Sequence, residues 1–134
     1  MISDFHCTFD NAIGISTEIT KDLKLSFPDA YMHADTMAKI AHAMKQKEGA
    51  AFCMLPFCHT VEAEAMGGIV NMGDGNLGPR AKEYCCTSAA ELLDLPEIDY
   101  SKGRIYEVLE ACQRLREEGE HVALMISGPF TIFN

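Results

Sequence analysis

A short polar cluster after an apolar run has residue types that could do chemistry. Cys58 and His59 follow the run at residues 50–56, and Glu62 and Glu64 come within the next turns of a short helix. His59 and Glu62 are three residues apart and share a helix face, so they could ligate a metal or couple a base to an acid. A capping carboxylate and a surface histidine are the more ordinary interpretation, since no standard zinc spacing is present. If this cluster is functional, we predict that Glu62 and Glu64 are catalytic residues and that Cys58 and His59 bind the substrate. We predict no metal ligand here.

A second candidate is the turn at residues 128–131, which follows the apolar run at 122–126. A glycine lets the backbone approach a ligand closely, a proline fixes the turn, and a threonine offers a hydroxyl at the carboxyl end of a strand. A turn that simply packs an aromatic ring is an equally good interpretation. The predicted substrate-binding residues of this turn are Gly128, Pro129, Phe130 and Thr131.

Two other patterns look functional but have ordinary explanations. Residues 73–78 match G-x-G-x-x-G, yet a dinucleotide fingerprint needs a helix that opens at the last glycines. No apolar helical period follows before Ser88, so we predict a surface loop. The adjacent Cys85 and Cys86 cannot act as a C-x-x-C redox pair, because neighbouring cysteines bridge only with strain. We predict ordinary thiols there.

Composition excludes several classes of protein. The 134-residue chain has a net charge of −9 and no cluster of Lys and Arg, which argues against a nucleic-acid partner. It has neither a basic, apolar leader nor an apolar run of membrane length. Its six cysteines are irregularly spaced, which is typical of reduced thiols. We predict a cytoplasmic protein with no membrane partner.

The elements that must position these residues follow an α/β pattern. Apolar runs at 50–56, 69–72 and 122–126 predict about three parallel strands, the first buried on both faces. Apolar residues at helical spacing predict helices over 29–48 and 102–118, each followed by a glycine. The expected buried stripe of the second helix is Ile105, Val108, Leu109, Cys112 and Leu115.

The predicted sheet is too small to be complete. Three strands leave both edges of a parallel sheet open, and a closed (β/α)₈ barrel needs roughly 250 residues. Residues 1–30 are weakly patterned and predict an irregular amino-terminal arm. We therefore expect the first part of a larger enzyme, or a product that a partner completes.

Four segments together resemble a known family. They are 55–58 (LPFC), 61–67 (VEAEAMG), 71–73 (NMG) with Pro79, and 128–131 (GPFT). They resemble the uroporphyrinogen decarboxylase superfamily, and most closely its methylcobamide:thiol (coenzyme M-type) methyltransferases, from about Ala34 to Thr131. The resemblance implies that residues 31–134 form the amino-terminal part of a (β/α)₈ barrel.

The branches of this family imply different chemistry. The decarboxylases carry an arginine-rich porphyrin-binding segment near their start, whereas the first arginine here is Arg80, so that branch is disfavoured. In the methyltransferases a zinc-bound thiolate accepts the methyl group, and the zinc ligands come from a later part of the barrel. The resemblance thus implies zinc and a corrinoid for a complete enzyme, and neither bound by this chain alone.

We therefore expect a fragment or split subunit of a corrinoid-dependent methyltransferase-like enzyme, inactive alone, that moves a methyl group from a methylcorrinoid protein to a thiol. The expected partners are a corrinoid protein or a tetrapyrrole-like ligand, and either the missing barrel half or another copy of the chain. Two alternatives stay open, which are a uroporphyrinogen decarboxylase of porphyrin biosynthesis and a noncatalytic, self-associating module.

Overall fold

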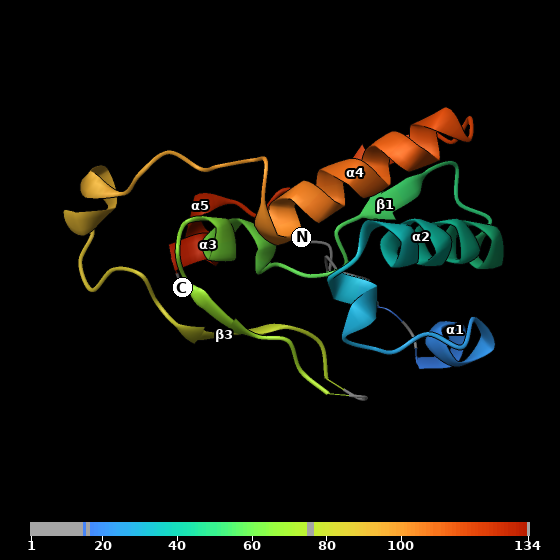
Figure 1. Cartoon of the computed structure of the whole chain (residues 1–134), viewed down its shortest axis with the longest axis horizontal. Coiled ribbons are helices and arrows are strands. Elements are labelled where there is room, and N and C mark those ends of the chain that lie inside the picture. The colour runs from blue at the N-terminus through green and yellow to red at the C-terminus, as the bar shows by residue number, and fades with distance from the viewer. Residues whose placement is uncertain (1–14, 16, 75–76, 134) are drawn as a thin grey trace, which may run out of the picture.

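Helices alternate with short strands along the chain, and the two long helices pack beside a small parallel sheet (Figure 1). The computed structural model describes residues 15, 17–74 and 77–133. The α-helices are α1 (Thr17–Asp22), α2 (Ala34–Glu48), α3 (Val61–Ala65), α4 (Gly103–Glu117) and α5 (Pro129–Phe133). The short 3₁₀ helices are η1 (Asp29–Tyr31) and η2 (Glu91–Asp94). The strands are β1 (Cys53–Leu55), β2 (Ile69–Asn71), β3 (Arg80–Glu83) and β4 (Val122–Leu124).

The core lies where α2 and α4 meet β1. Met37 and Ile40 of α2, Leu55 of β1 and Leu115 of α4 are almost fully buried. Each such side chain contributes about 1.5–3 kcal/mol by leaving water. This core fixes the direction of β1, and therefore the place where the chain emerges from its carboxyl end.

Both long helices occur where apolar spacing predicts them, and a glycine follows each within two residues of its end. Gly49 has φ +64°, a left-handed conformation that favours glycine, and its N–H bonds the carbonyl of Lys45. The first helix is shorter than predicted, because residues 29–31 form η1 and α2 begins only at Ala34. No helix in the described part of the chain is both long and apolar enough to cross a membrane.

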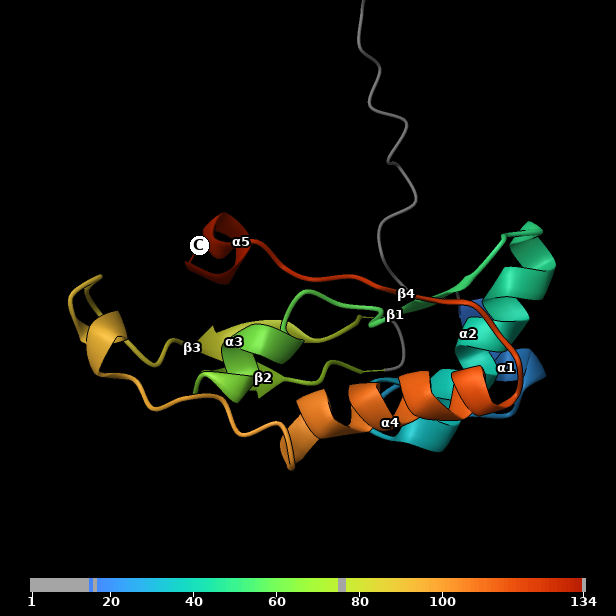
Figure 2. The same ribbon diagram turned by 90° about the horizontal axis from the view of Figure 1, so that it is seen from above.

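The parallel sheet consists of β1 and β4. Cys53 pairs with Val122 and Leu55 with Leu124, and α2 and α4 lie on one side of the pair (Figure 2). The expectation that the first strand is buried on both faces is wrong: Cys53 and Leu55 are fully buried, but Met54 between them is 48% exposed. Among the described residues, helices cover one face only, so alternate side chains of β1 are left exposed.

The predicted strand at 69–72 exists, but its parallel pairing is wrong. β2 pairs antiparallel with β3 in a separate sheet, with Asn71 opposite Arg80. The glycine-rich segment at 73–78 connects these strands, so a strand and not a helix follows it, as expected for a loop. Residues 75 and 76 of that motif lie outside the described residues. A Cβ at Gly73, where φ is +82°, would lie 1.8 Å from the carbonyl oxygen of Leu77. That glycine is therefore needed for the turn itself.

Part of the predicted irregular arm is structured. Thr17–Asp22 form α1, and the buried side chains of Ile15 and Ile19 join the core beside α2. Residues 1–14 and 16 lie outside the described part of the chain, so the arm prediction is untested there. The domain that packs as one core thus begins before residue 31.

The buried stripe of α4 overlaps with the predicted one only in part, and the predicted members Ile105 and Cys112 are half-buried against the core. Val108 and Leu115 are buried as expected, whereas Leu109 is 40% exposed. Arg104 and Ala111 complete the stripe instead, at spacings of four, three and four residues. This is the regular period of one helix face, with a cation at its first position.

We expect Leu115→Ala to lower the free energy of unfolding by about 2–5 kcal/mol, because it leaves a cavity between α4, α2 and β1. Leu93→Ala is the matched control, since Leu93 in η2 is 90% exposed, and it should change stability by less than about 0.5 kcal/mol. Urea denaturation followed by circular dichroism measures both. Equal midpoints for the two variants would contradict this placement of the core.

Candidate functional site

The parallel pairing of β1 and β4 brings the two predicted site segments together. Their carboxyl ends lie at the same edge of the sheet, so the chain after Leu55 meets the chain after Leu124. The backbone N–H of Ser127 donates to Glu62 Oε1 at 2.9 Å, and its hydroxyl donates to the carbonyl of His59 at 3.4 Å. Ser127 is 7% exposed and closes the contact between the two strand ends.

One carboxylate oxygen of Glu62 accepts a hydrogen bond, and the other has no hydrogen-bond partner among the described residues. Its Oε1 accepts the Ser127 N–H, while its Oε2 is buried without a hydrogen-bond partner in the described structure. A buried acceptor with no donor costs free energy, and such groups mark places where a ligand or proton can be taken up. Glu62 is therefore oriented by the second strand end and has capacity for a proton or a hydrogen bond.

Arg104 connects α4 to the segment that follows β1. Its side chain is 5% exposed and forms an ion pair with Glu64 through Nε. Its Nη2 donates to Thr60 Oγ1 at 2.8 Å, and its Nη1 lies 3.4 Å from Cys58 Sγ. One guanidinium thus satisfies three side chains of the turn that presents Glu62.

These contacts give two predicted site residues a structural setting. Glu64 forms an ion pair with Arg104, and this contact helps to position the turn after β1. A catalytic role for the Glu64 carboxylate stays a prediction. Cys58 is 7% exposed, with its sulfur directed to Arg104 and Thr60. Arg104 was not among the predicted site residues, because its charge excluded it from the apolar stripe. Its spacing from Val108 nevertheless fits one face of a helix.

A cavity of about 450 Å³ opens beside this cluster, between α3, the β2–β3 hairpin, the chain before η2, and α5. His59 and Thr60, in the chain after β1, line one part of the cavity. Thr131 and Ile132, in the chain after β4, line another part. Most of the wall is apolar, with a few polar groups at the side of the strand ends. This is the usual composition of a site for a small organic ligand.

The glycine-containing turn opens α5. The carbonyl of Gly128 accepts hydrogen bonds from the N–H groups of Thr131 and Ile132, at 3.0 and 3.1 Å. Pro129 is exposed, and the side chain of Phe130 is 81% exposed. The described residues do not bury the ring of Phe130, and a substrate-binding role for this turn stays a prediction.

The paired cysteines lie in the wall of the cavity as free thiols. The sulfurs of Cys85 and Cys86 are 3.7 Å apart. Desolvation, and then the neighbouring Cys85, raise the pKa of the Cys86 thiol. A raised pKa leaves the sulfur protonated and a poor nucleophile, in keeping with ordinary thiols.

The described side chains around Glu62 do not form a group of three metal ligands. Within the described residues, one group of His, Cys, Asp or Glu side chains could hold an ion, and it is His42, Cys53 and Glu120 at the other end of the strands. None of the residues around Glu62 belongs to it. The described residues around Glu62 can themselves contribute hydrogen bonding and proton transfer.

Comparison with known proteins gives one matching family model and several similar proteins that are named as methyltransferases. The family model described as uroporphyrinogen decarboxylase (URO-D) matches residues 15–134. A methylcobamide:CoM methyltransferase, MtaA of Methanosarcina barkeri, is 31% identical over 118 residues, which is 86% of this chain and 35% of that protein. MtbA of Methanosarcina mazei, of the same description, is 29% identical over 109 residues, 79% of this chain and 32% of its own length.

A solved structure agrees in fold. A methyltransferase from Methanosarcina mazei superposes with a TM-score of 0.70 at 28% identity, covering 90% of this chain and 37% of that one. The chain spans about a third of the length of the curated relatives it matches. The expected family and the α/β class are confirmed, and the sheet of the described residues is not a closed barrel.

We expect Arg104→Met to lower stability by about 3 kcal/mol, the lower end for a broken buried pair, because Glu64 is a third exposed and partly solvated. Arg114→Met is the matched control: Arg114 lies on the same helix and pairs with Asp35, but both are about half exposed or more. That pair should contribute about 0–1 kcal/mol. Thermal unfolding of the two variants compares them, and a loss for Arg104→Met no larger than for Arg114→Met would disprove the anchoring role.

Proposed function

The chain belongs to the uroporphyrinogen decarboxylase family, and from this premise we propose that it forms part of the active site of an enzyme that moves a methyl group from a methylcorrinoid protein to a thiol. The relatives that support this proposal are named methylcobamide:CoM methyltransferases. Since the chain spans about a third of their length, their activity, substrates and partners are all proposals for this protein.

The observation that carries the proposal is the half-engaged carboxylate of Glu62. In methyl transfer to a thiol, the sulfur–carbon bond forms while the cobalt–carbon bond breaks, and the cobalt keeps that electron pair. The thiol must release its proton. Glu62 Oε2 is buried with no hydrogen-bond donor among the described residues, and Glu62 lies in the chain between the cavity-lining residues Thr60 and Ala63. In this proposal it would accept the hydrogen bond of an incoming thiol and then its proton.

Other residues after the carboxyl ends of β1 and β4 would bind and orient the thiol acceptor. His59 and Thr131 line the cavity from the two strand ends and would contact the acceptor. Arg104 holds the turn that carries Glu62 and acts as a positioning residue. The described residues here do not form a metal-ligating set, so no metal step is assigned to them.

The decarboxylase alternative has less support from the cavity. Tetrapyrrole carboxylates need cationic partners, and no Lys or Arg lines the described cavity. Arg104 nearby is buried and already paired with Glu64. A carboxylated tetrapyrrole would meet Glu83 in the wall instead of a cation.

The noncatalytic alternative is favoured by one observation, which is the exposure of large apolar side chains on and after the strands. Met54 and Leu124 are 48% and 47% exposed, and Ile126 and Phe130 are 72% and 81% exposed. Exposed apolar side chains of this size would be covered in an assembly with another chain. Light scattering coupled to size exclusion, together with the assay below, separates this alternative from an enzyme.

We expect Glu62→Gln to lower kcat for methyl transfer by about 100-fold, because the amide keeps the shape of the side chain but cannot take a proton. The assay follows the visible absorbance of methylcobalamin with coenzyme M as acceptor, in the protein that contains this chain. Glu97→Gln is the control, since Glu97 is exposed in the connection before α4, and should leave kcat unchanged.

Unchanged activity of Glu62→Gln would remove this residue from the mechanism without removing the proposed reaction. Absence of methyl transfer in the parent protein would overturn the reaction itself. Release of carbon dioxide from uroporphyrinogen would then favour the decarboxylase. A defined oligomer with neither activity would favour the self-associating module.

A further inference from the structure

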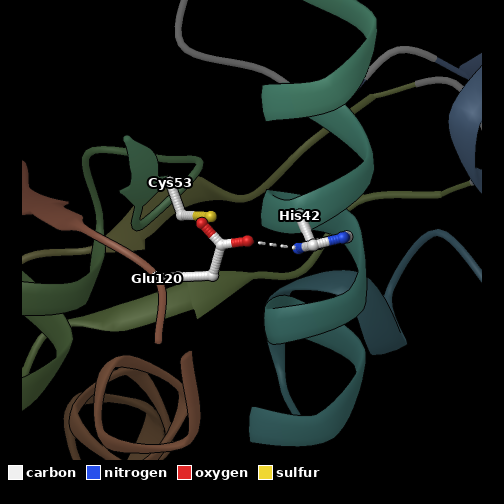
Figure 3. Close-up of side chains that lie close together, drawn as sticks. All are labelled: His42, Cys53 and Glu120. Carbon is white, nitrogen blue, oxygen red and sulfur yellow. Dashed lines mark ion pairs between the residues drawn. The ribbon is translucent and has the colours of Figure 1, made fainter. Parts of the chain in front are cut away.

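A second cluster of chemically active side chains lies at the opposite end of the parallel strands. His42 projects from α2, Cys53 is the first residue of β1, and Glu120 lies two residues before β4 (Figure 3). One ligand atom from each lies within 4.8 Å of the other two. The candidate active-site residues follow the carboxyl ends of the same strands, so the two sites are separate.

We propose that His42, Cys53 and Glu120 bind a divalent cation of the zinc class. An imidazole nitrogen, a thiolate and a carboxylate are the three donor types that zinc uses in proteins. Zinc binds them at about 2.0–2.3 Å, which places tetrahedral ligand atoms roughly 3.5 Å apart. His42 Nδ1 and Glu120 Oε1 are already 3.0 Å apart, so small side-chain movements would open the position.

The outer atoms of two ligands already have partners, as in well-ordered metal sites. Lys45 bonds the other carboxylate oxygen, Glu120 Oε2, and leaves Oε1 for the cation. Gln46 bonds the other ring nitrogen, His42 Nε2, at 2.8 Å. Ligation through Nδ1 requires a proton on Nε2, which the amide oxygen of Gln46 accepts after a half-turn of its amide group.

The charges of the cluster permit a cation despite the nearby lysine. Lys45 and Glu120 neutralise each other, and the Cys53 thiol is fully buried, with its pKa raised mainly by burial. A divalent ion would displace the thiol proton and so add a single positive charge. The whole chain carries a net charge of −9, which favours that addition. Without an ion, the same side chains form an ion-pair cluster between α2 and the start of β4.

Cobalt(II) is the probe that distinguishes a metal site from an ion-pair cluster, because a cobalt–thiolate bond gives a charge-transfer absorption that an ion pair lacks. The full chain, reduced and without an affinity tag, should bind one equivalent of cobalt with this band, and zinc should remove it. His42→Gln should lower the affinity by about tenfold or more, since one of three ligands is lost. Cys53→Ser should abolish the band.

Two controls keep the result tied to this cluster. Cys112→Ser removes another partly buried thiol, on α4, and should leave the band unchanged. The double variant Cys85→Ser with Cys86→Ser tests the exposed thiol pair and should also keep it. A parent chain without the band, a band that survives Cys53→Ser, or one that disappears with Cys85 and Cys86 would each overturn the proposal. The side chain of His42 is partly exposed, so the His42→Gln variant is expected to fold. It therefore still tests the proposal if Cys53→Ser does not fold.

Discussion

The buried guanidinium of Arg104 is the interaction on which the candidate site depends. It enters the apolar stripe of α4 at the position nearest the strand ends, and it satisfies Glu64, Thr60 and Cys58 together. A buried cation is costly unless it is paired and hydrogen-bonded. The turn after β1 must therefore adopt the conformation that supplies these partners, and that conformation presents Glu62 to the second strand end.

The direction of the strands gives the two ends of the sheet different chemistry. At the carboxyl ends, Glu62 and Ser127 meet beside a largely apolar cavity, which suits binding and proton transfer to a small ligand. At the amino ends, His42, Cys53 and Glu120 form a compact set of soft and hard donors next to α2. A cation there would link α2 to β1 and to the chain before β4. It would stabilise the folded domain without taking part in the proposed reaction.

The sequence predicted those features that arise from local patterns. α2 and α4 follow from apolar spacing and from the glycines after them, and the strands β1 and β4 follow from their apolar runs. The antiparallel partner of β2 could not be predicted, because β3 has the sequence RAKE with every residue exposed and no alternation of apolar side chains. Arg104 was missed for a related reason, since its burial depends on partners forty or more positions earlier in the chain.

Amide chemical shifts of this chain's residues, recorded in the protein used for the methyl-transfer assay while methylcobalamin and coenzyme M are added, test most directly whether the residues at the carboxyl ends of β1 and β4 are the functional ones. The expected result is a set of changes confined to residues 58–62 and 127–132 and to the cavity wall. Signals of His42, Cys53 and Glu120 should stay unchanged. Changes confined to the amino ends of the strands, or no changes at all, would contradict the placement of function at Glu62 and Ser127.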